Sequence, residues 1–344
     1  MSDSIKYILP KDGNFYKANL HTHTTVSDGK LTPEEAKARF KSMGYSVVAF
    51  TDHELMVPHP ELAEDDFLPL TGYEMSIDSE LESPYKRTYH LNYYSPDPMR
   101  SASRTMAVTS VWNRDYMQAM ITDEMRRLST GKRVYSKEFI QSLIDFATEE
   151  GALMSYNHPV WSLQTKDDYS GLKGLFGVEW ANSGCNIMGY FDTMQPIEDL
   201  NSEGERMCYP LAADDCHKDT EYGFSWVNIK SKSLEYGEIF EALRRGDFYS
   251  STGPEILEAY VEGTDVVVTT SPAAGIFLAT GNRQRQARRM HDEPLTKARF
   301  SIERMYEKLE FSPDKSKLWF RIDVLDEKGN FARTRAVFLD ELGE

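Results

Sequence analysis

Two histidines, His21 and His23, stand two positions apart, directly after the apolar residues Ala18 and Leu20. If residues 16–23 form a strand, side chains two apart share a face, and both imidazoles point to one side. Imidazole is a common ligand of zinc, iron and related ions. A single His-x-His pair is a weak signal, because such pairs also occur on solvated strands. The pair therefore predicts a metal site only if further ligands follow it.

Further histidines and carboxylates recur over the next two hundred residues, each on or at the end of a short apolar run that predicts a strand. They are His53, Glu74, His90, His158, Asp215 and His217. Six of the eight histidines follow this register, whereas His59 and His291 fall outside it and receive no role. Scattered surface histidines would not share such a register. The pattern predicts a barrel-like α/β domain with a multi-metal site at the carboxyl ends of its strands.

The elements that would position these ligands alternate between strands and helices. A helix is predicted over 33–44, with Thr32 as its N-cap and Pro33 in its first turn, and a strand over 46–51 follows it. Further helices are predicted over 115–130, 136–150 and 236–245. Further strands are predicted over 67–74, 88–94, 152–159, 175–182, 208–217 and 224–229. The opening strand, helix and strand form a βαβ unit, which indicates an α/β fold.

After Gly253 the pattern changes to short runs between turn signals, several of them alternating. Strands are predicted over 265–269, 275–279, 297–302, 307–311, 317–324 and 332–338, with a hairpin turn at 328–330. Six strands in about ninety residues predict a small β-sandwich. We therefore expect two domains, 1–253 and 254–344. The basic stretch 282–289 is expected to be a solvated loop, the alternative being that it lends cations to an anionic substrate.

Composition narrows the classes of protein. With 344 residues, 40% hydrophobic and 12% aromatic, the chain has the composition of a packed globule. A net charge of −16 argues against general nucleic-acid binding. No apolar run reaches the length of a membrane span, and the first ten residues lack a secretory signal, so we expect a cytoplasmic protein. The three cysteines predict no disulfide framework, and Cys216 is expected to pack.

The ligand motifs together resemble the PHP (polymerase and histidinol phosphatase) superfamily over about residues 15–253. The motifs that carry the resemblance are His21-Thr-His23, Ser27-Asp28-Gly29, Thr51-Asp52-His53, Gly72-Tyr73-Glu74, His90, Asn157-His158-Pro159 and Asp215-Cys-His217. The resemblance implies an α/β fold, a distorted (β/α)7 barrel that holds two or three Mn, Fe or Zn ions. Here the small all-β, sandwich-like domain would follow it.

The resemblance also implies a division of the ligands among three metals. His21, His23, Glu74 and Asp215 would hold the first, Glu74 would bridge to a second held with His90 and His158, and Asp28, His53 and His217 would hold the third. Many members have histidine where this chain has Asp28. A carboxylate is a harder ligand than imidazole and favours Mn or Fe over Zn.

The charge of such a site predicts its chemistry. Six neutral imidazoles and three carboxylates around three divalent ions sum to +6 − 3 = +3, and a bridging hydroxide reduces this to +2. The site would attract a phosphate dianion, and its hydroxide would attack phosphorus. Asp52, next to His53, is a candidate for orienting the ligands, and these two are the candidate catalytic residues. The leading hypothesis is a metal-dependent phosphoesterase acting through this hydroxide at a di- or trinuclear site.

The expected partner is a small anionic substrate, a phosphomonoester or a nucleotide, and the oligomeric state is left open. One alternative is carbamate or carboxylic-ester hydrolysis at the same metals, since 245–253 resembles the end of the domain in a branch that includes carbamate-ester hydrolases. Another is a non-catalytic metal- or ligand-binding protein. An amidohydrolase is disfavoured, because those enzymes usually place lysine where Glu74 stands. Four residues near the motifs are expected to have plain surface roles: Lys86, Arg87, Trp161 and Lys218.

Overall fold

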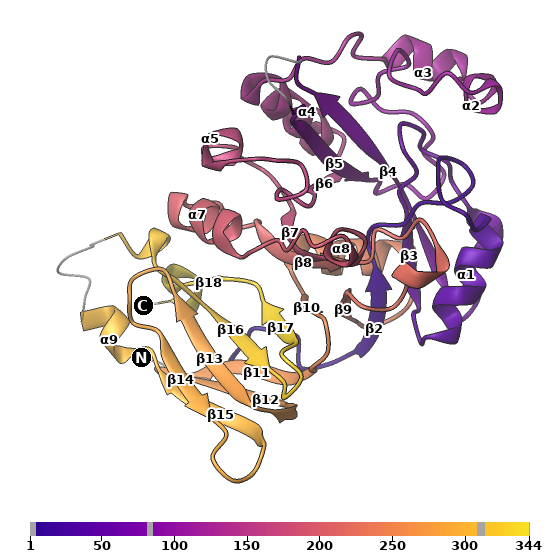
Figure 1. Ribbon diagram of the computed structural model, residues 1–344. Helices are drawn as coiled ribbons and strands as arrows, with labels where there is room; N and C mark the ends of the chain where they lie inside the picture. Colours follow the sequence, from indigo (N-terminus) through magenta and orange to yellow (C-terminus); the bar gives the residue numbers. More distant parts are fainter. Residues whose placement is uncertain (1–4, 81–84, 308–313, 344) are drawn as a thin grey trace.

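The computed structural model describes residues 5–80, 85–307 and 314–343, and its first part alternates strands with helices (Figure 1). The strands are β2 (Asn14–Asn19), β3 (Val47–Phe50), β4 (Leu68–Asp78), β5 (Thr88–Tyr94), β6 (Leu153–Tyr156), β7 (Gly177–Asn182), β8 (Tyr209–Ala213) and β9 (Trp226–Ser231). The longer helices are α1 (Pro33–Ser42), α4 (Lys137–Glu149), α7 (Gln195–Glu203) and α8 (Tyr236–Arg245). The shorter ones are α2 (Asp115–Ala119), α3 (Asp123–Leu128), α5 (Lys166–Tyr169) and α6 (Ser183–Ile187).

Side-chain caps explain where the helices begin. In α1 the Thr32 hydroxyl accepts a hydrogen bond from Glu35 N at 3.2 Å, and the Glu35 carboxylate accepts one from Thr32 N at 2.9 Å. This capping box confirms the predicted start. The single helix predicted over 115–130 is instead the pair α2 and α3. The Thr122 hydroxyl accepts from Met125 N at 3.1 Å, so it caps a new helix where continuation was expected.

The strands of this first part form one curved mixed sheet in the order β9-β2-β3-β4-β5-β6-β7-β8. The predicted α/β class is confirmed: β2, β3 and β4 are parallel, as are β6, β7 and β8. By contrast, β5 runs antiparallel to both neighbours. The stretch between Asp78 and Thr88 is too short for a crossover connection, so the chain must turn back. Within the described ranges no strand pairing joins β8 to β9. Past the strand ends, however, His23 N donates to the Cys216 carbonyl oxygen at 3.2 Å and Asp215 N donates to that of His21 at 2.9 Å, so hydrogen bonds link the segments that follow β2 and β8.

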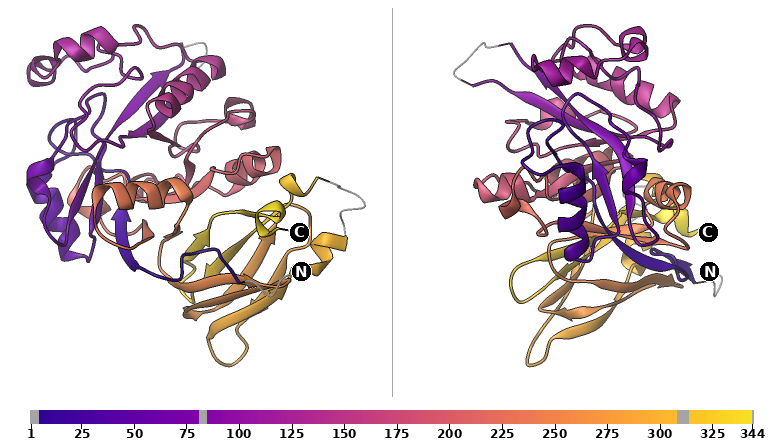
Figure 2. Two further views of the ribbon diagram at one scale, coloured as in Figure 1. Left: turned by 180° about the vertical axis from the view of Figure 1, so that it is seen from behind. Right: turned by 90° about the vertical axis from the view of Figure 1, so that its right-hand side faces the viewer.

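The large sheet continues into the C-terminal region. Strand β10 (Phe248–Ser251) pairs with β9 on one side and with β17 (Phe331–Thr334) on the other, and the sheet goes on through β16 (Trp319–Leu325), β13 (Gly275–Thr280) and β14 (Gln286–Arg289). The short β18 (Val337–Phe338) also pairs with β16. A second sheet has the order β1 (Lys6–Tyr7), β11 (Ile256–Glu262), β12 (Asp265–Ala273) and β15 (Leu295–Ser301). The predicted strand-rich region is thereby confirmed (Figure 2).

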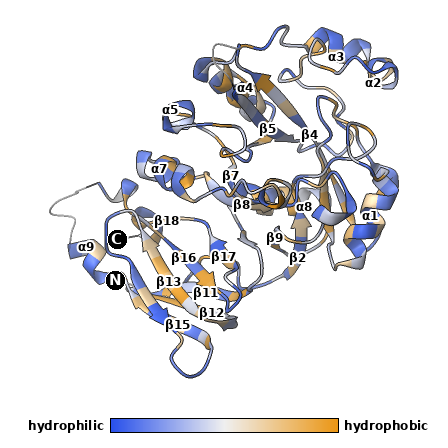
Figure 3. Cartoon of the chain, viewed as in Figure 1, coloured by the Kyte–Doolittle hydropathy of each residue, from blue (hydrophilic) through white to orange (hydrophobic). Residues whose placement is uncertain are grey.

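The two sheets of the C-terminal region enclose a hydrophobic core that includes Val266, Ile276 and Phe320. Figure 3 shows hydrophobic residues concentrated on β13 and β16. Ile8 and Leu9, from the beginning of the chain, belong to the same core. The boundary between 1–253 and 254–344 stays a prediction. In the part of the chain that is described, no helix is both long and apolar enough to cross a membrane.

Several details of the C-terminal prediction differ from the structure. Strand β11 was not predicted. The stretch 282–289 was expected to be a solvated loop, but its second half is β14, an edge strand whose side chains remain largely exposed while its backbone pairs with β13. The strand predicted over 307–311 lies outside the described residues except for Glu307, which ends α9 (Glu303–Glu307). The predicted turn at 328–330 does join β16 to β17.

Candidate metal centre

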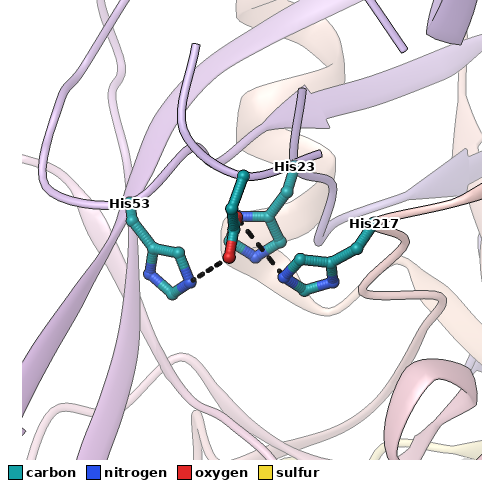
Figure 4. Close-up of side chains that lie close together, drawn as sticks. His23, His53 and His217 are labelled. Carbon is teal, nitrogen blue, oxygen red and sulfur yellow. Dashed lines mark ion pairs between the residues drawn. The ribbon is translucent and has the colours of Figure 1, made fainter. Parts of the chain in front are cut away.

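The nine predicted ligand side chains meet at one end of the curved sheet. They come from the segment after β2 (His21, His23, Asp28), the segment after β3 (His53), β4 (Glu74), β5 (His90), the segment after β6 (His158) and the segment after β8 (Asp215, His217). Asp28 and His217 are about one third exposed, and the other seven are buried or nearly so. Figure 4 shows His23, His53 and His217 facing one another, with dashed lines marking ion pairs at this end of the sheet.

Two strands end earlier than predicted, before the candidate ligand residues. Strand β2 ends at Asn19 and β8 ends at Ala213, so His21, His23 and Asp215 follow the strands instead of lying in them. The Asn19 side-chain oxygen accepts hydrogen bonds from His21 N at 3.3 Å and Asp214 N at 3.1 Å, which ties the two strand ends together. The backbone turns sharply there, since Asp215 has a φ of 50°. His158 also has a positive φ, of 26°. Backbone strain of this kind clusters at functional sites.

Four groups of ligand atoms lie within 4.8 Å of one another, one atom from each residue. They are His23, Asp28, His53 and His217; His21, His158 and Asp215; His21, His23 and Glu74; and Glu74, His90 and His158. Glu74 belongs to two of these groups, and so does His23. Two groups keep to the division among metals that the resemblance implies. In the other two, His23 joins the residues assigned to the third metal, and His158 joins His21 and Asp215. The ligand roles themselves stay a prediction.

The distances between these atoms fit a bound cation. His21 Nε2 lies 3.2 Å from Glu74 Oε1 and 3.3 Å from Asp215 Oδ1. His23 Nε2 lies 3.3 Å from Glu74 Oε2 and 3.1 Å from Asp215 Oδ1. Ligands about 2.05 Å from a tetrahedral ion stand roughly 3.3 Å apart. These separations are therefore those of the edges of a metal polyhedron.

Five of the six histidines have one ring nitrogen held by an oxygen outside the centre. The pairs are His21 Nδ1 with Glu179 Oε1 (2.8 Å), His23 Nδ1 with Ser27 Oγ (3.4 Å), His90 Nε2 with Ser76 Oγ (3.0 Å), His158 Nδ1 with Ser162 Oγ (3.2 Å) and His217 Nδ1 with the Asp215 carbonyl oxygen (3.0 Å). A histidine that donates from one nitrogen presents the lone pair of the other. This arrangement is typical of histidines that bind metals.

Two buried atoms at the centre lack any hydrogen-bond partner among the described residues, namely His53 Nδ1 and Asp215 Oδ1. An unpaired buried polar atom is costly unless something else satisfies it. His53 Nδ1 lies 3.2 Å from Glu74 Oε2, and Asp215 Oδ1 lies 3.1 Å from His23 Nε2. A cation among these atoms would satisfy both. The residues present therefore fit a divalent metal ion.

The pKa values of the histidines at the centre are shifted by burial and by their charged neighbours. Burial lowers the pKa of His21, but Asp215, Glu74 and Glu179 outweigh it and raise this pKa well above its usual value. Burial also lowers the pKa of His23, yet the nearby carboxylates of Asp215 and Glu74 raise it to about 10. Burial, reinforced by His23, depresses the pKa of His53. Burial raises the pKa values of Glu74 and Asp215, but the surrounding histidines outweigh it and hold both well below their usual values.

Asp52 acts on the turn that carries Asp28. Its carboxylate accepts hydrogen bonds from Thr24 N at 2.7 Å, Thr24 Oγ1 at 2.8 Å and Ser27 Oγ at 2.8 Å. Because Ser27 donates its proton to Asp52, its oxygen is free to accept from His23 Nδ1. The orienting role proposed for Asp52 therefore runs through Ser27 to His23, and these contacts do not lead to the ring of its neighbour His53.

One functional residue was missed from the sequence. Glu179, in β7, is 1% exposed and accepts hydrogen bonds from His21 Nδ1, His158 N (3.1 Å) and Asn182 Nδ2 (2.8 Å). The signal was a carboxylate inside a continuously apolar strand, which requires a partner when buried. A second supporting contact comes from Asn157, whose Nδ2 donates to Glu74 Oε1 at 2.9 Å.

A cavity of about 340 Å³ opens over the centre. Besides ligands, Trp161, Cys185, Met188 and Glu221 line it, and its described lining contains no lysine or arginine. Lys86 pairs with Asp78, Arg87 with Asp168 and Lys218 with Glu221. Four residues near the motifs were expected to have plain surface roles, and of these Trp161 borders the cavity. Cys216 is buried and packs with Phe40 and Tyr45, as predicted.

The curved α/β sheet and the converging imidazoles and carboxylates define a domain that is placed to bind metal. Residues 19–178 match the family model of the PHP domain. The matched stretch includes His21 to His158, whereas Asp215 and His217 lie beyond it. No curated protein matches the chain.

Three solved structures show low similarity. A two-domain protein from Bacteroides vulgatus, described as containing a predicted PHP-like metal-dependent phosphoesterase, is 14% identical over 98% of this chain and 99% of its own, with a TM-score of 0.45. A candidate metal-dependent phosphoesterase from Bifidobacterium adolescentis is 14% identical over 68% and 96%, with a TM-score of 0.40. An amidohydrolase from Chromobacterium violaceum, with bound sulfate and no metal, is 16% identical over 59% and 88%, with a TM-score of 0.36.

Proposed function

We propose that the protein is a metal-dependent phosphoesterase that hydrolyses a small phosphomonoester or a nucleotide at a di- or trinuclear site. The observation that carries this proposal is the convergence of six histidines and three carboxylates, in which five imidazoles have one ring nitrogen within hydrogen-bond distance of a supporting oxygen. A domain that only resembled the family would have no need of these supporting contacts. The matched PHP domain agrees with the proposal.

The charge of the ligand set favours an anionic substrate. With neutral imidazoles, the nine ligands carry three negative charges, so two divalent ions leave about +1 and three leave about +3. Bound ions would polarise a phosphoryl oxygen and lower the pKa of water. The protein's own residues fix the ligands, and Trp161 and Met188 add apolar surface to the cavity walls. The volume of about 340 Å³ favours a small ester.

A second candidate is hydrolysis of a carbamate or a carboxylic ester at the same ligands. The observation that favours it is the absence of lysine and arginine from the described cavity lining, together with the apolar side chains of Trp161 and Met188. A neutral ester needs no cation beyond the metals. A third candidate, metal or ligand binding without catalysis, is separated from both by an assay of turnover.

The test is a substrate panel with protein loaded with Mn. We expect release of phosphate from 4-nitrophenyl phosphate or a nucleotide, and a loss of about 100-fold or more in kcat/KM for His21→Ala and Asp215→Asn. The matched control is His291→Ala, whose side chain is 94% exposed. Turnover of aryl carbamates without phosphate release would favour the second candidate. Metal binding without turnover of any substrate would leave only the third.

A further inference from the structure

A second cavity, of about 1030 Å³, lies between the first part of the chain and the C-terminal region. Its walls come from β7, from α6, from the segments 191–194 and 223–226, and from β17 with the turn before it. Helix α6 separates the two cavities: Ser183 and Asn186 face this one, whereas Cys185 faces the metal centre. Neither the PHP domain nor the proposed hydrolysis accounts for this cavity.

Two cations line the cavity, Lys328 and Arg333, and Arg333 has little compensating negative charge. The Arg333 guanidinium lies 3.8 Å from the centre of the Trp180 ring and 4.3 Å from that of Phe331. Its side chain is 12% exposed, and its Nε and Nη1 are buried with no hydrogen-bond acceptor among the residues that the structure describes. The carboxylate with which it pairs, Asp323, is 3.7 Å away and already accepts two hydrogen bonds from Arg321.

Burial lowers the pKa of Arg333 to about 10, which reflects the same shortage of negative charge. A cation held between two rings and short of acceptors attracts an anion strongly, because little water screens it. Two other carboxyl groups line the cavity. Asp326 is occupied by the backbone N–H groups of Lys328 and Asn330, at 2.8 Å each. Burial raises the pKa of Asp192 to about 7, so this group is only partly charged at neutral pH.

Beside polar residues such as Ser183 and Asn186, the walls carry uncovered aromatic side chains. Phe191 is 66% exposed and Phe224 is 57% exposed, and both line the cavity. Large apolar side chains gathered in one concave place mark a binding site. The volume is at the upper end of the range for sites of small organic ligands, about 300–1,000 Å³. A ligand here would therefore combine an aromatic body with a negative group.

We propose that this cavity is a second binding site, for a planar aromatic molecule that carries one negative charge. The anionic group lies at Arg333 and the ring lies against Phe191 and Phe224. Trp180, which stacks on Arg333, is adjacent in β7 to Glu179, which holds His21. The two sites thus share a strand, but the proposal does not depend on the hydrolytic activity.

The probe is 2-naphthoate, and its neutral counterpart is 2-naphthamide. Titration of the full-length protein by calorimetry is expected to show saturable binding of one naphthoate per chain. The affinity for the amide should be lower by about tenfold or more. Arg333→Met should remove this preference, and Arg333→Lys should retain part of it. The matched control is Arg288→Met, an exposed arginine on β14, which should bind as the unmodified protein does.

A second variant, in the aromatic wall of the cavity, tests the proposal even if the arginine variants fail to fold. Phe224→Ala removes a mostly exposed side chain and should weaken binding of both ligands about tenfold. Equal affinity for acid and amide, or no saturable binding of naphthoate, would overturn the proposal. So would binding that Arg333→Lys and Phe224→Ala leave unchanged while His21→Ala abolishes it, since the probe would then occupy the metal centre.

Discussion

At the scale of a single residue, Glu179 holds the imidazole ring of His21 in place. Its Oε1 lies 2.8 Å from His21 Nδ1 and fixes which imidazole nitrogen faces the centre. In Glu179→Gln the side chain keeps its size but loses the charge that strengthens this bond. Loss of such a supporting group typically lowers metal affinity about 10–100-fold, and we expect a loss in that range. Competition with a chelating indicator measures it.

The matched control for this variant is Glu124→Gln, on α3, where the side chain is 56% exposed and far from the ligands in sequence and contact. It should bind Mn as tightly as the unmodified protein. Glu179→Gln with unchanged affinity, and with an unfolding temperature equal to that of the control, would show that His21 needs no support from Glu179.

Asp28 is the predicted ligand at which metal preference should be set. Its Oδ1 lies 3.5 Å from His217 Nε2 and its Oδ2 lies 3.9 Å from His53 Nε2. Asp28→His replaces a hard oxygen ligand with imidazole, so the ratio of Zn affinity to Mn affinity should rise by about tenfold. His21→Ala, which removes a ligand altogether, serves as the comparison, because it should weaken both metals. An unchanged ratio in Asp28→His would remove Asp28 from the ligand set.

Strand β16 carries a buried ion pair whose effect depends on pH. Arg321 donates to the Asp323 carboxylate at 2.8 and 3.1 Å and to Glu198, on α7, at 2.7 Å. Burial raises the pKa of Asp323, but Arg321 and Arg333 outweigh it and bring this pKa below its usual value. A carboxylate with a lowered folded-state pKa contributes stability above its unfolded pKa, about 4, and loses it as the pH falls further.

Asp323→Asn should therefore lower the free energy of unfolding by about 3 kcal/mol at pH 7, with a smaller difference from the unmodified protein below about pH 4. Urea unfolding between pH 3 and 7 measures both. Asp66→Asn, at a side chain that is 71% exposed, is the control and should change little. A difference that does not depend on pH would mean that the charge of Asp323 is not what stabilises the strand.

Elements that rest on local chemistry were predictable from the sequence. Helix α8 has the predicted bounds, and α1 begins at its predicted cap. The predicted ligands could be picked out because each ends or lies on an apolar run, and the structure brings their side chains together. The direction of β5 was not predicted, because alternation of side chains carries no information about which way a strand runs. Strand β14 was missed because its exposed side chains have the composition of a loop, and Glu179 because its partner is distant in sequence.

At the scale of the whole molecule, the large sheet contains both the strands near the predicted ligands and the C-terminal strands β13, β14, β16 and β17. The link is β10, which pairs with β9 and β17. The two cavities lie on either side of α6 within this arrangement. A ligand in the larger cavity would therefore touch both parts of the chain, whereas the metal centre is built from the first part alone.

The pairing of β1 with β11 bears on the order of events as the protein is made. Ile8 N and Leu9 N both donate to the carbonyl oxygen of Ala259, about 250 positions later. At 5–20 residues per second, the ribosome needs on the order of ten seconds or more to supply that partner. The beginning of the chain must wait unpaired while the ligand-bearing strands assemble. Its docking is then a late step, one that closes the edge of the smaller sheet.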